Sequence, residues 1–294
     1  MVGIFLHFGP ASLASAFEGL RWADVLAWGV LTLAARLALV ETVRLPLIAL
    51  GFKAGRRELF WFNAIRTFAN QIVPLSGLAA FAQMLRRRLG ITWSELAALA
   101  SPQFVLALVA LSVIGIVAVA INFRQLGPPD LALLLMYLAV FVVAMLLSSG
   151  APWFIDALPH AWSRRATNVT EALRKLQRHP GLVVRLAAVH GVAILLRGGR
   201  IWILFAAAGV SLSWSQMLLV VAIAESTMLL NVTPGGLGIR EGAILGAGAL
   251  VGIPTDTAAG VAVLDRLLTV AFTVLLTPPA LVFLRTGAAT TASE

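Results

Sequence analysis

Long apolar segments alternate with short polar stretches along most of the sequence. Five of these segments are long enough for a helix to cross a bilayer, which takes about 20 residues, and none shows the period-two alternation of a membrane β-strand. The pattern therefore predicts an all-α polytopic membrane protein. The five predicted spans are 24–50, 94–121, 131–148, 182–210 and 257–284.

Two further apolar segments contain a proline in their middle. Residues 60–85 include Pro74, and residues 214–253 include Pro234, which begins a run rich in glycine. Proline lacks a backbone donor and glycine is conformationally loose, so neither segment can continue as one helix. Broken backbone at membrane depth is tolerated only where protein buries it or where it lines a watery cavity. We therefore expect both breaks to line an internal site. A plain loop between two membrane helices is the alternative for the second.

The flanks of the two broken segments differ in charge. The first lies between two basic clusters, at 53–57 and 86–88, whereas no basic loop borders the second. Because basic loops stay on the cytoplasmic side, the first segment should enter from the cytoplasm, turn at Pro74 and return, and the second should enter from outside. Each is thus predicted to form a re-entrant helical hairpin.

The elements fall into two similar triplets, each with a span, a broken hairpin and a second span. Repeat 1 covers about 24–121 and repeat 2 about 182–284, and the span 131–148 links them and reverses the second relative to the first. Such an inverted repeat is the plan of many secondary transporters, in which interrupted helices in corresponding positions mark the binding site. We expect a single membrane domain over 1–294.

Two stretches outside the repeats are predicted to lie at the membrane surface. Residues 152–179 carry basic side chains opposite apolar ones at helical spacing, which is typical of an amphipathic interfacial helix. A solvated cytoplasmic linker is the alternative there. Residues 1–19 have no Lys or Arg before their apolar part, so a short interfacial helix is expected and not a cleaved signal.

Composition supports this class and excludes others. The chain has 60% hydrophobic and 12% charged residues, which is too apolar for a soluble domain. Lys and Arg number 22 against 13 Asp and Glu, for a net charge of +9, which in a membrane protein serves topology and predicts no nucleic-acid partner. Cysteine is absent and the four histidines are scattered, so no disulfide, metal site or cofactor is expected.

Charged residues inside the apolar segments are the strongest sign of function. Each costs about 2.5–3.5 kcal/mol at the middle of a membrane helix, so these side chains should face the protein interior. Arginines outnumber carboxylates by seven to four, which suits an anionic or zwitterionic headgroup. The alternative for Glu41 is a simple pair with Arg44 or Arg36 near the helix end. The set consists of Arg36, Arg44, Arg66, Arg197, Arg200, Arg240 and Arg266 against Glu41, Glu225, Glu241 and Asp265.

The two hairpins should bring helix amino ends together near the membrane midplane. Half-helices that begin near Ser76, as a capping residue, and near Ile239 would present unpaired N–H groups and positive dipole ends to an anion such as phosphate. No Ser/His/Asp set or acidic catalytic pair stands out, so no catalytic residue is assigned. The predicted substrate-binding residues are Asn231, Pro234, Gly235, Gly236, Gly238, Arg240, Glu241, Arg66, Asn70, Pro74, Ser76, Arg200, Glu225, Asp265 and Arg266.

Three groups of residues resemble motifs of a known family. They are the run Pro-Gly-Gly-Leu-Gly-Ile-Arg-Glu-Gly at 234–242, the couple Asp265-Arg266, and the set Asn70, Pro74 and Gly77 ahead of the arginines at 86–88. With these motifs the chain, over roughly 30–285, resembles flippase-like proteins related to the transmembrane region of lysylphosphatidylglycerol synthase, the multiple peptide resistance factor. The first hairpin departs from the family pattern, because residues 78–80 are Leu-Ala-Ala where an acidic residue is usual.

The resemblance implies translocation of a polar or anionic lipid between the leaflets of a bacterial inner membrane. It also implies that this chain corresponds to the translocase part alone, without the aminoacyltransferase domain of lipid-modifying relatives, and is not an enzyme. The expected partner is the membrane lipid. Whether the protein forms a homo-oligomer is left open by the sequence. A proton-coupled carrier of a small soluble anion and a membrane-embedded lipid transferase are the alternatives.

Overall fold

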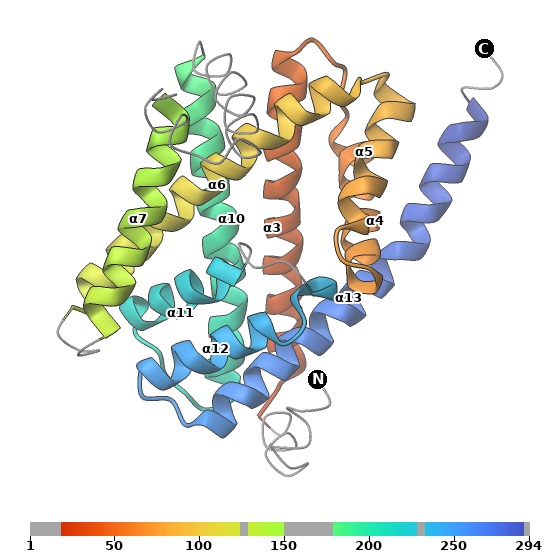
Figure 1. The fold of residues 1–294 in the computed structure, drawn as a ribbon. Helices are drawn as coiled ribbons and strands as arrows, with labels where there is room; N and C mark the ends of the chain where they lie inside the picture. The colour runs from red at the N-terminus through yellow and green to blue at the C-terminus, as the bar shows by residue number, and fades with distance from the viewer. Residues whose placement is uncertain (1–18, 124–128, 150–178, 228–232, 291–294) are drawn as a thin grey trace.

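The computed structural model describes residues 19–123, 129–149, 179–227 and 233–290, and within these ranges the chain is helical without strands. Five helices are long and apolar enough to cross a membrane, and each corresponds to a predicted span. This confirms an all-α multi-pass membrane protein (Figure 1). The helices that contain these spans are α3 (Trp22–Ala49), α6 (Trp93–Ile121), α7 (Pro129–Ser149), α10 (Pro180–Ala207) and α13 (Thr255–Thr290).

Both predicted helix breaks are present. In the first, α4 (Arg56–Ile72) ends two residues before Pro74 and α5 (Ser76–Leu89) begins two residues after it. The second lies between α11 (Trp214–Ser226) and α12 (Ile239–Leu250), where the short 3-10 helix η2 (Pro234–Gly236) interrupts the path. The new helices begin at Ser76 and Ile239, the two positions predicted from the sequence.

The tips of the two broken pairs meet. The 3-10 helix η2 packs against α4, and Figure 1 shows the α4–α5 turn reaching down toward η2 beside the lower half of the long helix α3. Each broken helix also packs against the last span of the other triplet: α4 of the first triplet lies against α13 of the second, and α11 of the second lies against α6 of the first. An inverted repeat would produce such an exchange of partners. The repeat itself, the division of the chain into its segments and the re-entrant placement of the hairpins stay predictions.

Two details differ from the expectations. Ser76 does not cap α5: its hydroxyl donates to the carbonyls of Ala69 and Val73, both at 2.8 Å, because the last carbonyls of α4 also lack helical partners. The cap comes instead from Asn70, whose side-chain oxygen accepts the Gly77 N–H at 2.8 Å. The helix α13 also continues beyond the predicted span 257–284, to Thr290, because the exposed side chain of Arg285 can extend to water without ending the helix. The predicted interfacial segments 1–19 and 152–179 fall almost wholly outside the described residues, as 1–18 and 150–178 are not described.

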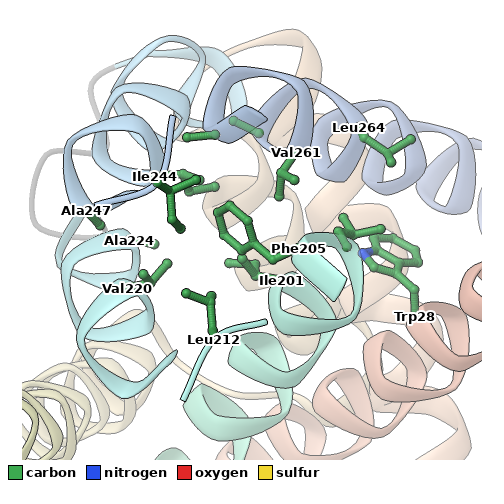
Figure 2. Close-up of a cluster of buried hydrophobic side chains, with 14 residues drawn as sticks. Trp28, Ile201, Phe205, Leu212, Val220, Ala224, Ile244, Ala247, Val261 and Leu264 are labelled. Carbon is green, nitrogen blue, oxygen red and sulfur yellow. The ribbon is translucent and has the colours of Figure 1, made fainter. Parts of the chain in front are cut away.

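A buried apolar cluster holds α11 and α12, the helices on either side of the second break, in place. Figure 2 shows Trp28 from α3, Phe205 from α10, Val220 from α11, Ile244 from α12 and Leu264 from α13 packed around one centre. All five side chains are buried. Burial of large apolar side chains fixes the relative positions of these helices, so the polar side chains that they carry are held in a defined arrangement.

Gly198 lets α11 approach α10. A Cβ atom at this position would lie 2.3 Å from Cγ2 of Val221, whereas a Cβ at Gly191 in the same helix would meet nothing within 4 Å. We expect Gly198→Ala to destabilise the protein by about 1–3 kcal/mol through overpacking. Gly191→Ala should leave stability unchanged or raise it by up to about 1 kcal/mol, because alanine favours helix. Thermal unfolding of both variants in detergent tests this, and equal melting temperatures would contradict it.

Candidate functional site

A cavity of about 110 Å³ lies where the two broken pairs meet α10 and α13. Six of its lining residues belong to the set predicted from the sequence, and they come from α10 and from the consecutive elements η2, α12 and α13. The cavity is lined by Gln71, Arg200, Gly235, Arg240, Glu241, Ile244, Ala262, Asp265, Arg266 and Thr269.

Asp265 is the buried centre of a charged network. One carboxylate oxygen accepts the indole N–H of Trp28 at 3.0 Å, and the other accepts from Arg200 at 3.2 Å. Nε of Arg240 lies 3.6 Å from that second oxygen. The Arg200 guanidinium also lies over the Trp28 ring, 5.2 Å from its centroid. Trp28 therefore contributes both a hydrogen bond to the carboxylate and a cation–π contact to its partner.

Glu225 extends this network to α11. One of its carboxylate oxygens lies 2.8 Å from a guanidinium nitrogen of Arg197, and the other lies 3.1 Å from one of Arg240. The Glu225 side chain is buried. Arg240 thereby stands between Glu225 and Asp265. Because removal of one partner of a buried ion pair leaves an uncompensated charge, these contacts hold α10, α11, α12 and α13 together.

Arg266 joins the two tips. Its guanidinium donates to the Gln71 side-chain oxygen at 2.8 Å and to the Gly235 carbonyl, and its Nε lies 3.9 Å from Glu241. The other Glu241 oxygen accepts the Gly238 N–H at 2.7 Å, which caps α12. Gly235 has φ +56°, and a Cβ there would lie 2.3 Å from the Gln71 oxygen. Glycine is thus required at the point where the tips touch.

The network keeps one excess positive charge and several polar atoms without a partner. Arg197, Arg200, Arg240 and Arg266 face Glu225, Glu241 and Asp265, four cations against three carboxylates. Among the described residues, five buried atoms on the cavity lining have no hydrogen bond. These are Nε of Arg200, Nε and Nη2 of Arg240, one oxygen of Glu241 and the hydroxyl of Thr269. Buried polar atoms are usually satisfied, so the cavity is suited to a polar ligand with anionic character.

Other residues that were predicted to bind substrate do not line the cavity, and some of them stabilise the turn between α4 and α5. Arg66 lies over the Phe81 ring at 5.5 Å, between α4 and α5, and is not on the cavity lining. Asn70, Ser76 and Pro74 shape the first turn.

The glycine backbone also differs from the expectation. Gly235, Gly236 and Gly238 were predicted to bind substrate, but the Gly236 N–H bonds to the carbonyl of Thr233 and the Gly238 N–H to Glu241. Pro234 begins η2, and Asn231 lies outside the described residues.

Two predicted interior charges are used elsewhere. Glu41 pairs with Arg44 at 3.2 Å and with Arg56, which confirms the alternative of a simple pair near the helix end. Arg36 donates to the Thr273 hydroxyl at 2.9 Å and lies over the Phe272 ring. Neither residue lines the cavity.

Sequence reasoning missed three contributors to the site. Trp28 looks like any core aromatic residue in an apolar helix, and Thr269 like any small residue of a span. Gln71 follows Asn70 directly, and its position one residue from a predicted site residue in a broken membrane helix was the available signal. No group of three metal-binding side chains occurs in the part of the chain that the structure describes.

The Trp28–Asp265 contact should stabilise the protein. In Trp28→Phe the carboxylate loses a neutral donor and a smaller ring fills the space, so we expect a loss of about 1.5–3 kcal/mol. Trp22→Phe is the matched control, because Trp22 lies in the same helix and is exposed. Thermal unfolding in detergent measures both. A Trp28→Phe melting temperature equal to that of the control would show that the indole contact does not support Asp265.

Comparison with known proteins places the chain in a family. A family model described as the lysylphosphatidylglycerol synthase transmembrane region matches residues 1–277, which include both helix breaks and every residue on the cavity lining. Searches of curated proteins and of solved structures gave no match. Since the model covers far more than half of the sequence, the chain belongs to the family of the lysylphosphatidylglycerol synthase transmembrane region.

Proposed function

We propose that this protein moves a polar or anionic lipid between the two leaflets of a bacterial inner membrane, without itself modifying the lipid. The observation that carries this proposal is the cavity between the two helix breaks, where Arg200 and Arg240 keep unpartnered donors inside a multi-pass membrane protein. Family membership supports a lipid-related role in the membrane.

The charge of the network fits a phosphodiester headgroup. Guanidinium groups bind phosphate oxygens through strong charge-assisted hydrogen bonds. The single excess positive charge of the four arginines and three carboxylates would be balanced by the single negative charge of a phosphodiester. In this proposal Arg240 and Arg200 contact the phosphate directly, while Glu225 and Asp265 position them.

The headgroup needs more room than this conformation offers. Ligand pockets usually measure about 300–1,000 Å³, whereas the cavity measures about 110 Å³. Arg266 closes it from one side, because it ties Gln71 of α4 to Gly235 of η2. A phosphate that draws Arg266 away from these two acceptors would free the tips and widen the cavity. The acyl chains would stay in the lipid phase while the re-entrant hairpins exchange access between the two sides.

The size of the cavity favours a second candidate, a carrier of a small soluble anion. About 110 Å³ holds a small ion without any widening. Reconstituted vesicles separate the two functions, since a translocase exchanges labelled anionic lipid between leaflets while a carrier takes up an anion such as phosphate. Anion uptake together with absent leaflet exchange for anionic, zwitterionic and aminoacylated lipids would replace our proposal by the second candidate.

Arg240 should be essential for translocation. We expect Arg240→Gln to slow leaflet exchange of anionic lipid at least about tenfold, because a charge-assisted contact is worth about 1.5–3 kcal/mol. Arg21→Gln is the control, since Arg21 is 80% exposed and pairs only locally with Asp24. The measurement is chemical quenching of outer-leaflet fluorescent lipid in proteoliposomes.

Folding and function are separable in this test. Arg240→Lys keeps the charge but loses the bidentate geometry, so it should retain more stability than Arg240→Gln and still translocate slowly. Wild-type exchange rates in a folded Arg240→Gln protein would remove Arg240 from the mechanism.

Gln71 tests whether the tips must separate. Gln71→Glu places a carboxylate against Arg266 and should strengthen the tie, which raises the melting temperature and slows translocation. Gln71→Met has a similar shape without an acceptor and should lower the melting temperature by removing one hydrogen bond, worth about 1.5–3 kcal/mol when one partner is charged. If Gln71→Glu is more stable yet exchanges lipid as fast as wild type, tip separation is not part of the cycle.

A further inference from the structure

One end of the molecule carries a group of basic residues that the central site does not use. We name this group the basic rim, and it comes from the loop before α4, the first turn of α4, the last turn of α5 and the C-terminal part of α13. It consists of Lys53, Arg57, Arg86, Arg87, Arg88 and Arg285. Figure 1 shows the start of α4 and the end of α5 at the same end of the molecule.

Contacts with aromatic and backbone groups gather the rim. The guanidinium of Arg57 lies 5.3 Å from the ring centroid of Phe283, and Arg88 donates to the carbonyl of Leu284 at 3.4 Å. Arg86 lies 4.5 Å from the ring centroid of Trp93, which is 56% exposed. A guanidinium stacked on a ring keeps its edge N–H groups available for a planar anion such as phosphate.

Carboxylates in the neighbouring helices α3 and α6 have partners outside the rim. Glu41 is engaged by Arg44 and Arg56, and Glu95 accepts the Thr92 N–H at 2.8 Å as the cap of α6. Glu58 is the other carboxylate of these elements in the described chain. The six cations of the rim thus share their own segments with one carboxylate.

At the opposite end of the molecule the charges differ. Arg21 pairs with Asp24, and Asp256 stands at the start of α13. Among the described residues, that end thus carries no cluster of basic side chains comparable to the rim.

We propose that the basic rim binds the headgroups of anionic lipids in the adjoining leaflet and concentrates them beside the α4–α5 pair. Clusters of four to eight basic residues next to membrane helices attract anionic lipid surfaces, roughly fivefold in affinity for each residue. The exposed side chains of Leu281 and Val282 in α13 precede the rim and offer an apolar surface to the acyl chains. The supply of lipid to the cavity rests on the proposed function, whereas the binding of lipid at the rim does not.

The absence of cysteine makes a direct test simple. A single Gly55→Cys, at an exposed position between Lys53 and Arg57 where a Cβ is accommodated, carries a fluorophore within the rim. Thr255→Cys, exposed at the start of α13, carries the same label at the opposite end. The labelled proteins are placed in nanodiscs that contain a few per cent of a headgroup-quencher lipid, either phosphatidylglycerol-like or phosphatidylcholine-like.

The anionic quencher should act several-fold more strongly than the neutral one at residue 55 and equally at residue 255. The variant K53Q/R57Q/R86Q/R87Q should be quenched almost equally by both lipids, and high salt should weaken the preference of the unsubstituted protein, whereas Arg21→Gln should preserve it. Equal quenching at residue 55 by both lipids, or a preference that survives the fourfold substitution in a folded protein, overturns the proposal. Because the measurement needs no translocation, it stands even if the central cavity carries a soluble anion.

Discussion

The burial of charge among apolar helices is the constraint on which the rest of this structure depends. Asp265, Glu225 and Glu241 are all buried, and each costs several kcal/mol at membrane depth unless it is paired and hydrogen-bonded. Arg197, Arg200, Arg240 and Arg266 supply those pairs from helices that are otherwise held by apolar contacts. The helices that carry these groups can therefore separate only if other partners replace the ones they lose. This requirement links the packing of α10 to α13 with any movement of the site.

The broken helices solve a related problem. A continuous helix uses its backbone groups internally and presents only side chains, whereas a break leaves backbone donors and acceptors that need partners. Here Asn70 accepts the Gly77 N–H, Glu241 accepts the Gly238 N–H, and Arg266 donates to the Gly235 carbonyl. The breaks are thus satisfied by side chains, two of which line the cavity. A change in the cavity would change the caps of the helices.

The sequence predicts the helices well because hydropathy and proline act locally. Span length follows from the thickness of the bilayer, and the breaks follow from Pro74 and from Pro234 with its glycines, so both starts, at Ser76 and Ile239, were correct. The partners of the charges were harder to predict because they come from distant parts of the chain. Trp28 bonds to Asp265 across 237 positions and Gln71 to Arg266 across 195. Which side chain caps the helix after a break depends on how far that side chain extends. The Asn70 side chain extends across the turn to the Gly77 N–H, whereas the Ser76 hydroxyl bonds back to α4.

The carboxylates of the network affect the release of a bound phosphate group as well as the stability of the protein. Four arginines without counter-charges would bind a phosphate group so tightly that it could not leave, and they would be costly to bury when empty. Glu225 and Asp265 already share Arg240, so an arriving phosphate gains only the difference between its own contacts and those that it displaces. When the phosphate departs, the same carboxylates take the guanidinium back. A nearly balanced network of this kind binds an anion weakly enough to pass it on, which a transport site requires and a storage site does not.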